Sequence, residues 1–348
     1  MSNIVANNHD FSLGPSPAAW QLALKRAIRQ PAELLRLLEL PASLAPKLET
    51  SPHPFPLRVP RGFVARMKPG DPDDPLFRQV WPLDEEHRPV DGFTADPVGD
   101  TAATVGPGLL HKYEGRALLV ATGACAVHCR YCFRRHFPYE DSPPNRAAWQ
   151  QAVQAIAGDE SLTEVILSGG DPLSLVDEQL AWLVARLAEI PHLRRLRVHS
   201  RWPVVIPERV DDGLLGWLTG TRLTPVMVIH ANHAQELDST VSAAMNRLHR
   251  AGVLLLNQSV LLRGVNDNVP ALAALSEALI DLRVTPYYLH QLDRVTGAAH
   301  FEVPASHGLE LLSQLHSILP GYAVPRYVQE IPGASGKLPV STLTFAAV

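Results

Sequence analysis

Cysteine is nearly absent from this chain: only three occur in 348 residues, and all of them, Cys125, Cys129 and Cys132, lie in one short stretch. The odd number and the C-x2-C spacing exclude the disulfide framework of a small secreted protein. Buried structural cysteines are usually scattered through a sequence, so this clustering indicates that the three thiols serve one centre.

Two further absences limit the class of protein. There is no excess of basic residues, and the formal net charge of −4 argues against a general nucleic-acid or membrane-surface role. No run approaches the roughly 18 apolar residues of a membrane span. The first residues, MSNIVANNHD, lack the basic and apolar regions of a signal peptide. We therefore expect a cytoplasmic protein with neither a nucleic acid nor a membrane as partner.

The spacing C-x3-C-x2-C supplies three thiolates, one fewer than usually close an iron–sulfur cluster or a structural zinc site. A [4Fe–4S] cluster held by three thiolates leaves one iron with an open coordination position, which metal-based catalysis requires. Two other interpretations stay open at this point. The cysteines are simply buried apolar residues, or they form a zinc site completed by His128 or His136.

From residue 116 onward, short β-branched or leucine-rich runs alternate with amphipathic helical windows, which is typical of βα units and a parallel sheet. The expected strands are 117–121, 164–168, 195–199, 225–230, 253–260 and 284–290. The expected helices between them include 145–157, 177–189 and 238–250. This pattern predicts an α/β fold, a partial (β/α)6 TIM-like barrel, within residues 108–348.

Residues 1–107 differ in composition and are predicted to form an N-terminal extension. A helical stretch over 18–40 is interrupted by Pro31, which fits the first turn of a second helix. The segment from 41 to 107 is rich in proline, which favours extended packing across another part of the protein. The interleaved aromatic residues, which favour an ordered segment that caps the barrel, are Phe55, Phe63, Phe77, Trp81 and Phe93.

In such barrels the reactive groups lie where strands end, on the C-terminal face. The cysteine loop follows the first expected strand, and Ser168-Gly169-Gly170-Asp171 follows the second. Two glycines at a strand end allow a close approach to a ligand and present N–H donors, although the same residues also suit a simple turn. Polar residues that end or lie within the later strands are His230, Asn257, Gln258, Tyr287, Tyr288 and His290.

Lys337 lies in PGASGKLPV, near the C-terminus. A lysine between glycines and prolines is usually a solvated loop residue. The alternative is a lysine that forms a Schiff base with pyridoxal phosphate (PLP). A phosphate pocket needs basic and hydroxyl groups, and His111, Lys112, Tyr113 and Arg116 would supply them just before the first strand, unless they form an exposed turn.

Taken together, several segments resemble the lysine 2,3-aminomutases, which are radical S-adenosylmethionine (SAM) enzymes that also use PLP. The resemblance runs from about His111 to Val340, and the motifs occur in the family's order: CAVHCRYCFRR, LSGGDPL, RVHSRWPVVIPERV, LLNQSVLLRGVNDN, VTPYYLHQLD and PGASGKLPV. It implies a radical SAM barrel and an isomerase that converts L-lysine to β-lysine. The implied cofactors are a [4Fe–4S] cluster, SAM and PLP.

The resemblance also implies roles for individual residues. The cluster ligands are Cys125, Cys129 and Cys132, and Lys337 is the lysine that binds PLP covalently. The residues implied to contact the PLP phosphate are Lys112, Tyr113 and Arg116. The residues implied to contact SAM are Ser168, Gly169, Gly170, Asp171, His230 and Gln258. The residues implied to bind the substrate are Arg134 at its carboxylate and Asp293 and Glu330 at its distal ammonium.

Four departures from the family pattern stand out. Lys112 occupies a position where these enzymes tend to have arginine, so the charge stays but the bidentate fork is lost. Glu330 stands where an aspartate is expected. Asn268 stands where a zinc-binding cysteine is found in the free-lysine enzymes, and the chain given ends at Val348 without their C-terminal segment. We therefore expect no structural zinc site of that type, and any oligomer must use other contacts.

The N-terminal segment HPFPLRVPRGFVARMKPGDPDDPLFRQVWPL resembles the branch that makes (R)-β-lysine for attachment to elongation factor P. The implied partners are L-lysine, an electron donor such as flavodoxin or ferredoxin, and elongation factor P with its lysine ligase. Two alternatives remain: an aminomutase acting on free lysine or a related amino acid in metabolism, and a non-catalytic iron–sulfur or zinc-binding scaffold.

Overall fold

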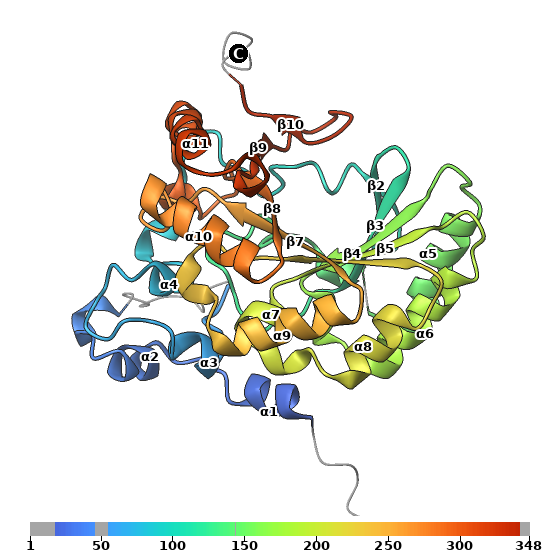
Figure 1. The fold of residues 1–348 in the computed structure, drawn as a ribbon, viewed down its shortest axis with the longest axis horizontal. Coiled ribbons are helices and arrows are strands. Elements are labelled where there is room, and N and C mark those ends of the chain that lie inside the picture. The colour runs from blue at the N-terminus through green and yellow to red at the C-terminus, as the bar shows by residue number, and fades with distance from the viewer. Residues whose placement is uncertain (1–17, 46–54, 143, 342–348) are drawn as a thin grey trace, which may run out of the picture.

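The computed structural model describes residues 18–45, 55–142 and 144–341. Its centre is one curved sheet of ten strands that follow each other in chain order (Figure 1). The strands are β1 (Thr104–Gly106), β2 (Leu109–Tyr113), β3 (Arg116–Thr122), β4 (Glu164–Gly169), β5 (Arg195–Ser200), β6 (Thr224–Ile229), β7 (Leu254–Val260), β8 (Thr285–His290), β9 (Arg326–Gln329) and β10 (Leu338–Pro339).

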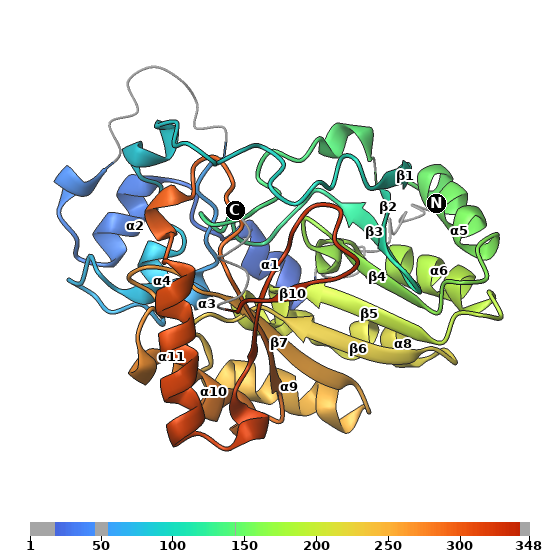
Figure 2. The same ribbon diagram turned by 90° about the horizontal axis from the view of Figure 1, so that it is seen from above.

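Strands β3 to β9 are parallel, and a helix lies between each pair on the outer side of the sheet (Figures 1 and 2). These helices are α5 (Arg146–Ala157), α6 (Asp177–Ala188), α8 (Asp212–Thr219), α9 (Ser239–Arg250), α10 (Val269–Asp281) and α11 (Ala305–Ile318). All six predicted strands are confirmed within one residue at either end, as are the three predicted helices. The partial βα barrel is confirmed, and β9 adds a further parallel strand.

Helix α9 illustrates how the amphipathic helices pack against the sheet. In α9 the buried residues are Val241, Ala244, Met245 and Leu248, spaced so that they share one face. The Asp238 carboxylate caps this helix by accepting hydrogen bonds from the backbone N–H groups of residues 240 and 241. Each fully buried aliphatic side chain contributes about 1.5–3 kcal/mol. Burial of this face against the sheet therefore determines where the helix lies.

The edges of the sheet differ from the sequence prediction. The segment containing Lys112 and Tyr113 is strand β2, antiparallel to β3, and not an exposed turn. Gly115, with φ at +75°, makes the tight connection between these two strands. At the other edge, β10 runs antiparallel to β9 and brings Lys337 back toward the sheet. These strands are too short to show a periodic pattern in the sequence.

The N-terminal helices are α1 (Ala19–Lys25), α2 (Pro31–Leu37), α3 (Arg61–Val64) and α4 (Pro75–Arg78). Helix α3 contacts α7 (Trp202–Val205) of the barrel. Pro31 is the first residue of α2, as predicted. Phe63, Phe77 and Trp81 are buried in the same hydrophobic cluster as the barrel residues. The ordered proline-rich segment is thus confirmed for its described residues; positions 46–54 lie outside them. Within the described ranges, no helix has the length and apolar character to cross a bilayer.

Candidate active site

A cavity of about 360 Å³ lies on the inner face of the sheet, within the size range of small-molecule sites. Every site residue that the family resemblance implies lines it, with the exception of Asp171, whereas His111 and Asn257 do not line it. The cavity begins at the cysteine loop, beyond the C-terminal ends of the strands, and continues inward to Arg116 at the start of β3. The predicted groups therefore extend deeper than the rim on which the sequence placed them.

The three cysteines share the wall of this cavity. Burial raises the pKa of the Cys125 thiol well above its ordinary value and that of Cys132 to about 11. Burial therefore disfavours a free thiolate at these two cysteines. A metal that binds the sulfur displaces its proton, so a metal-bound thiolate remains compatible with this environment. Among the described residues, no three Cys, His, Asp or Glu side chains converge as a site for a single metal ion.

The two histidines of the zinc interpretation have other partners. The His128 ring bonds the carbonyl of Pro56 at 2.7 Å and stacks on Phe55 with ring centroids 4.6 Å apart. The His136 ring bonds the Thr296 carbonyl at 3.1 Å. The structure therefore does not support either histidine as the fourth ligand of a zinc site.

The N-terminal segment holds the cysteine loop in place. Glu86 is buried and accepts from Arg130 Nε at 2.8 Å and from Arg135 Nη2 at 2.6 Å. Burial alone would raise the pKa of Glu86, but the two guanidinium groups outweigh it and hold that pKa below its ordinary value. The backbone N–H of Arg130 also donates to the Gln79 carbonyl. Nothing local in the sequence marks Glu86, because its partners lie more than forty positions away.

The Gly-Gly segment serves the fold in a way that the sequence did not indicate. The N–H of Gly170 donates to the Thr122 carbonyl at 2.7 Å, and the N–H of Asp171 donates to the Ala124 carbonyl at 2.8 Å. The N–H of Gly170 is therefore engaged within the fold and is not the free donor to a ligand that the sequence suggested.

Asp171 also differs from the expectation that it contacts a cofactor. Its carboxylate accepts from Ser200 Oγ and from the N–H of Arg201, both at 2.7 Å, and it does not line the cavity. Burial raises the pKa of Asp171 to about 7, although these hydrogen bonds oppose the shift. Asp171 therefore joins the ends of β4 and β5 and positions the adjacent glycines.

Replacing Gly170 by alanine is expected to destabilise the cysteine loop. A Cβ at this position would lie 2.6 Å from the carbonyl oxygen of Ala124, which is backbone and cannot easily move. Overpacking of this kind costs about 1–3 kcal/mol. Urea unfolding and the iron content after reconstitution would measure the effect. Gly216→Ala is the matched control and should not lower stability, because a Cβ there would meet no described atom within 4 Å beyond its chain neighbours and the backbone of α8.

A chain of ion pairs crosses the cavity wall. Lys337 Nζ lies 2.6 Å from Glu330 Oε2, and Glu330 Oε1 lies 2.8 Å from Lys112 Nζ. The Asp100 carboxylate continues the chain, at 2.6 Å from both Lys112 Nζ and Arg134 Nε. This ion-pair chain joins the C-terminal segment, β2, the N-terminal segment and the cysteine loop. Asp100, which the sequence analysis missed, links Lys112 to Arg134 in this chain.

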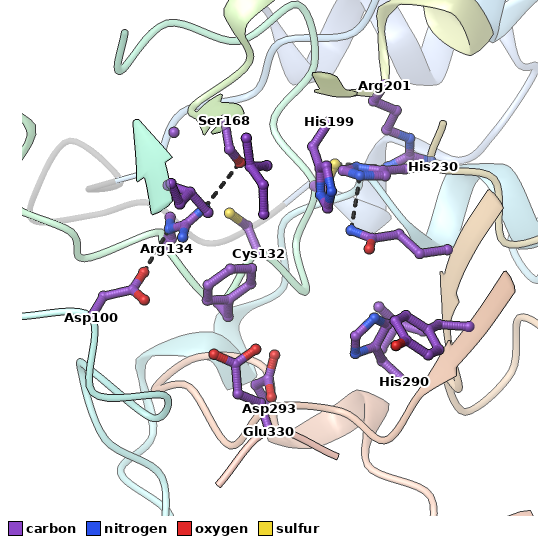
Figure 3. A pocket seen from close by; sticks show the side chains of 18 of the residues that line it. Asp100, Cys132, Arg134, Ser168, His199, Arg201, His230, His290, Asp293 and Glu330 are labelled. Carbon is purple, nitrogen blue, oxygen red and sulfur yellow. Dashed lines mark hydrogen bonds and ion pairs between the residues drawn. The ribbon is translucent and has the colours of Figure 1, made fainter. Parts of the chain in front are cut away.

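Arg134 and Asp293 present opposite charges to the cavity (Figure 3). Arg134 Nη1 donates to Ser168 Oγ at 3.2 Å, while its Nε is taken by Asp100. Burial alone would lower the pKa of Arg134, but Asp100 outweighs it and raises that pKa. Asp293 lies beside Glu330 in Figure 3, and burial raises the pKa of its carboxyl to about 7. A buried carboxyl of this kind favours a cationic partner.

Glu330 and Lys112 have roles in the structure that differ in detail from those expected of them. Both Glu330 oxygens are engaged by lysines, and the positive charges hold its pKa at about 2 against the opposing effect of burial. The Lys112 ammonium donates to Val98 O and to Glu330, and it forms an ion pair with Asp100. Lys112 therefore fixes the wall of the cavity in the structure and does not present a free ammonium to a phosphate.

One side of the cavity is built from uncharged rings. His290 is buried, and His199 and His230 are partly buried. Desolvation lowers the pKa of each, to about 3 for His230 and well below the usual value for the other two. Gln258 Nε2 lies 2.9 Å from His230 Nε2, and a neutral imidazole can accept from that amide. Tyr287 and Tyr288 stack with ring centroids 3.7 Å apart. This wall suits a flat heterocycle.

The cavity also contains polar atoms that fit an organic cofactor. Tyr113 Oη, His199 Nε2 and His290 Nε2 are buried without a hydrogen-bond partner in the described part of the chain. The Arg116 guanidinium lies over the Tyr113 ring, 4.7 Å from its centroid. Hydroxyl, guanidinium and aromatic groups together match the needs of a phosphorylated ring, and the unpartnered imidazole nitrogens are available to a polar ligand.

No family model matches this chain. Curated relatives match it over nearly its whole length. It is 48% identical to the L-lysine 2,3-aminomutase of Escherichia coli (strain K12) over 329 residues, 94% of this chain and 95% of that protein. It is 46% identical to the enzyme of the same name from Haemophilus influenzae, over 91% of this chain and 94% of that protein.

More distant similarities extend the comparison. The L-lysine 2,3-aminomutase of Clostridium subterminale is 39% identical over 80% of this chain and 67% of that protein. Among solved structures, a radical SAM methyltransferase from Sphaerobacter thermophilus is similar with a TM-score of 0.41 and 19% identity, over 67% of this chain and 73% of that chain. The identities of the first two relatives, over almost the entire length, decide the assignment. The chain belongs to the L-lysine 2,3-aminomutase family of isomerases.

Proposed function

We propose that this chain converts L-lysine to (R)-β-lysine with a [4Fe–4S] cluster, SAM and PLP. The observation that carries the proposal is one cavity that gathers three thiols, a lysine amine, an arginine and a buried carboxyl. When bound, the cluster and SAM supply the radical, and PLP carries the migrating amino group. Cys125, Cys129 and Cys132 would hold the cluster, and Lys337 would hold PLP, with Arg116 and Tyr113 at the phosphate.

The protein's own residues would orient the substrate. Arg134 suits the substrate carboxylate, because a guanidinium matches a planar two-oxygen group. Asp293 would bind the distal ammonium at the opposite side of the cavity, and Glu330 would hold Lys337 and Lys112 beside it. Ser168, Gly169, Gly170, His230 and Gln258 would contact SAM. Fixing both ends of the lysine sets which carbon faces the radical and contributes to the rate through orientation.

The proline-rich segment would close this site. Phe55 and Asp100, both from residues 1–107, line the cavity together with residues of 108–348. We therefore propose that the N-terminal extension shields the radical chemistry from water in addition to completing the ion-pair chain. Proteolytic removal of the residues before 107 should abolish turnover, and retention of turnover would contradict this role.

The test of the proposed function is an anaerobic assay. Protein reconstituted with iron and sulfide is incubated with PLP, SAM, dithionite and L-lysine, and β-lysine is separated by chiral chromatography. Formation of (R)-β-lysine that requires each cofactor would support the proposal. Absence of β-lysine from a preparation with a verified [4Fe–4S] cluster and bound PLP would contradict lysine as the substrate, whereas metal without bound PLP would favour the scaffold alternative.

Asp293 predicts a specific pH dependence. Burial raises its pKa to about 7, so it is neutral at lower pH and cannot pair with an ammonium group. Lysine keeps its charge up to a pKa of about 10.4. We expect kcat/KM for lysine to rise as the pH increases to about 7 and then to level off. Measurement of initial rates at subsaturating lysine between about pH 5.5 and 8.5, well below the pKa of the lysine side chain, checks this.

The variant Asp293→Asn should lose both the activity and the pH dependence. Loss of one partner of a buried charge pair costs about 2–5 kcal/mol, which corresponds to roughly 30- to 4,000-fold in kcat/KM. Glu302→Gln is the control, because that carboxylate is paired with Arg294 at 2.7 Å on a partly exposed surface. A profile unchanged in Asp293→Asn would contradict the assignment of the distal-ammonium site.

For the finer role, we propose that the product is attached to elongation factor P by its lysine ligase in the cytoplasm, with a flavodoxin or ferredoxin as the electron donor. The resemblance of the N-terminal segment to that branch supports this choice over metabolism of free lysine. Mass spectrometry of elongation factor P from a strain lacking this chain distinguishes the two. A missing β-lysine modification supports the proposal, and an unchanged mass supports the metabolic alternative.

A further inference from the structure

Arg201 contacts one of the three cysteines directly. It follows β5, is 4% exposed, and its Nη1 donates to Cys129 Sγ at 2.7 Å and to Tyr131 Oη at 2.7 Å. Figure 3 shows Arg201 at the edge of the cavity, next to His230. The other arginines near the loop bond different atoms: Arg58 donates to the Cys125 carbonyl oxygen, and Arg130 to Glu86. Arg201 thus places its positive charge next to the sulfur atom of Cys129.

A buried network fixes the guanidinium from behind. Arg201 Nη2 donates to Gln79 Oε1 at 2.7 Å and lies 3.0 Å from Glu236 Oε2. Asn232 Nδ2 donates to the same Gln79 oxygen at 2.9 Å and to Tyr131 Oη at 2.6 Å. Gln79 and Glu236 are fully buried. Because each of these groups restrains another, Arg201 cannot turn away from Cys129 without leaving buried polar atoms unpaired.

We propose that Arg201 raises the reduction potential of the cluster that Cys129 would ligate, and so assists the electron transfer that begins each turnover. This inference rests on the proposed function, because it requires the cluster. Hydrogen bonds and positive charge at cluster sulfurs stabilise the reduced form, which carries one more negative charge. The effect is strong in a buried site, where the effective dielectric constant is low. Arg201 is a positioning residue that acts through Cys129.

The network gives two variants with opposite expected signs. Arg201→Met removes the charge and the hydrogen bond, so the potential should fall. Glu236→Gln removes the negative charge on the far side of Arg201 while keeping a similar shape, so the potential should rise. Arg58→Gln is the control, because it removes a cation that bonds a backbone oxygen and not a sulfur, and its shift should be smaller than that of Arg201→Met.

The experiment is a redox titration of the reconstituted full chain, without SAM, followed by the EPR signal of the reduced cluster. We expect Arg201→Met to shift the reduction equilibrium at least tenfold toward the oxidised form, or about 59 mV for one electron. A cluster with the wild-type potential in Arg201→Met would overturn this inference and leave the proposed function intact. Failure of the wild type to bind any cluster would overturn both.

A second measurement needs no variant and covers the case in which Arg201→Met does not retain the cluster. Wild-type protein labelled with 15N-arginine is reconstituted and reduced, and pulsed EPR is used to detect coupling between the cluster spin and arginine nitrogen. A hydrogen bond from Arg201 to a ligating sulfur predicts a resolved 15N coupling. Its absence from the reduced wild-type cluster would overturn the inference.

Discussion

Lys337→Ala is expected to abolish β-lysine formation, with a loss of about 10⁴-fold or more, because a residue that holds a cofactor covalently cannot be replaced by positioning alone. In the structure the Lys337 amine is not a free loop lysine, since it lies on the cavity wall and donates to Glu330 at 2.6 Å. The assay for β-lysine is combined with borohydride reduction of PLP-loaded protein and mass spectrometry, which should find the adduct on the peptide containing Lys337.

Two comparison variants separate loss of PLP from loss of the cluster. Cys129→Ala should retain the PLP adduct and lose the iron–sulfur absorbance, whereas Lys337→Ala should do the reverse. Lys68→Ala, at an exposed lysine paired with Asp71, should change neither. Substantial β-lysine formation by Lys337→Ala, or an adduct on another lysine, would contradict the assignment of Lys337 as the PLP lysine.

Asp100→Asn is expected to be the most destabilising isosteric substitution in the site, by about 3–5 kcal/mol. The Asp100 carboxylate is 2% exposed and pairs with two cations, Lys112 and Arg134, each at 2.6 Å. Removing its charge leaves both cations buried with too little compensation, while the shape of the site stays the same. Chemical unfolding of the variant measures the free energy, and the KM for lysine should rise as Arg134 loses its support.

Asp96→Asn provides the matched control in the same segment. The Asp96 carboxylate accepts from the N–H groups of Asp100 and Thr101 at 2.9 Å and forms no ion pair within the described part of the chain, so its loss should cost only about 1 kcal/mol. If Asp100→Asn costs no more than Asp96→Asn, the ion-pair chain does not stabilise the fold, and Asp100 is only one of several caps in the N-terminal segment.

Local patterns in the sequence were sufficient for the barrel. The six predicted strands match β3 to β8 within one residue. Strands of a parallel sheet that is covered by helices consist of short apolar runs, and such runs can be recognised from neighbouring residues in the sequence. Pro31 was predicted to begin a helix for an equally local reason, its fixed φ and missing N–H. The cysteine spacing and the lysine near the C-terminus also stand out in the sequence, since their chemistry depends on residue type.

Partnerships between distant residues could not be predicted in this way. Asp100 meets Arg134, and Glu86 meets Arg130, across intervals in which the chain folds through unrelated elements. From the sequence alone, Asp100 and Glu86 cannot be told apart from exposed acidic residues, because the arginines that pair with them are far away along the chain. Asp171 was assigned to a cofactor because of its motif, yet its carboxylate joins two strand ends.

The sequence by itself therefore determined the order of the βα units, the family resemblance and which residue types could perform the chemistry. Only the tertiary structure decided how their charges are balanced: Lys337 against Glu330, Arg134 against Asp100, and Arg201 against Cys129. The physical reason is that strand and helix patterns arise from neighbours along the chain, whereas the energy of a buried charge depends on whichever partner the completed fold brings within hydrogen-bonding distance.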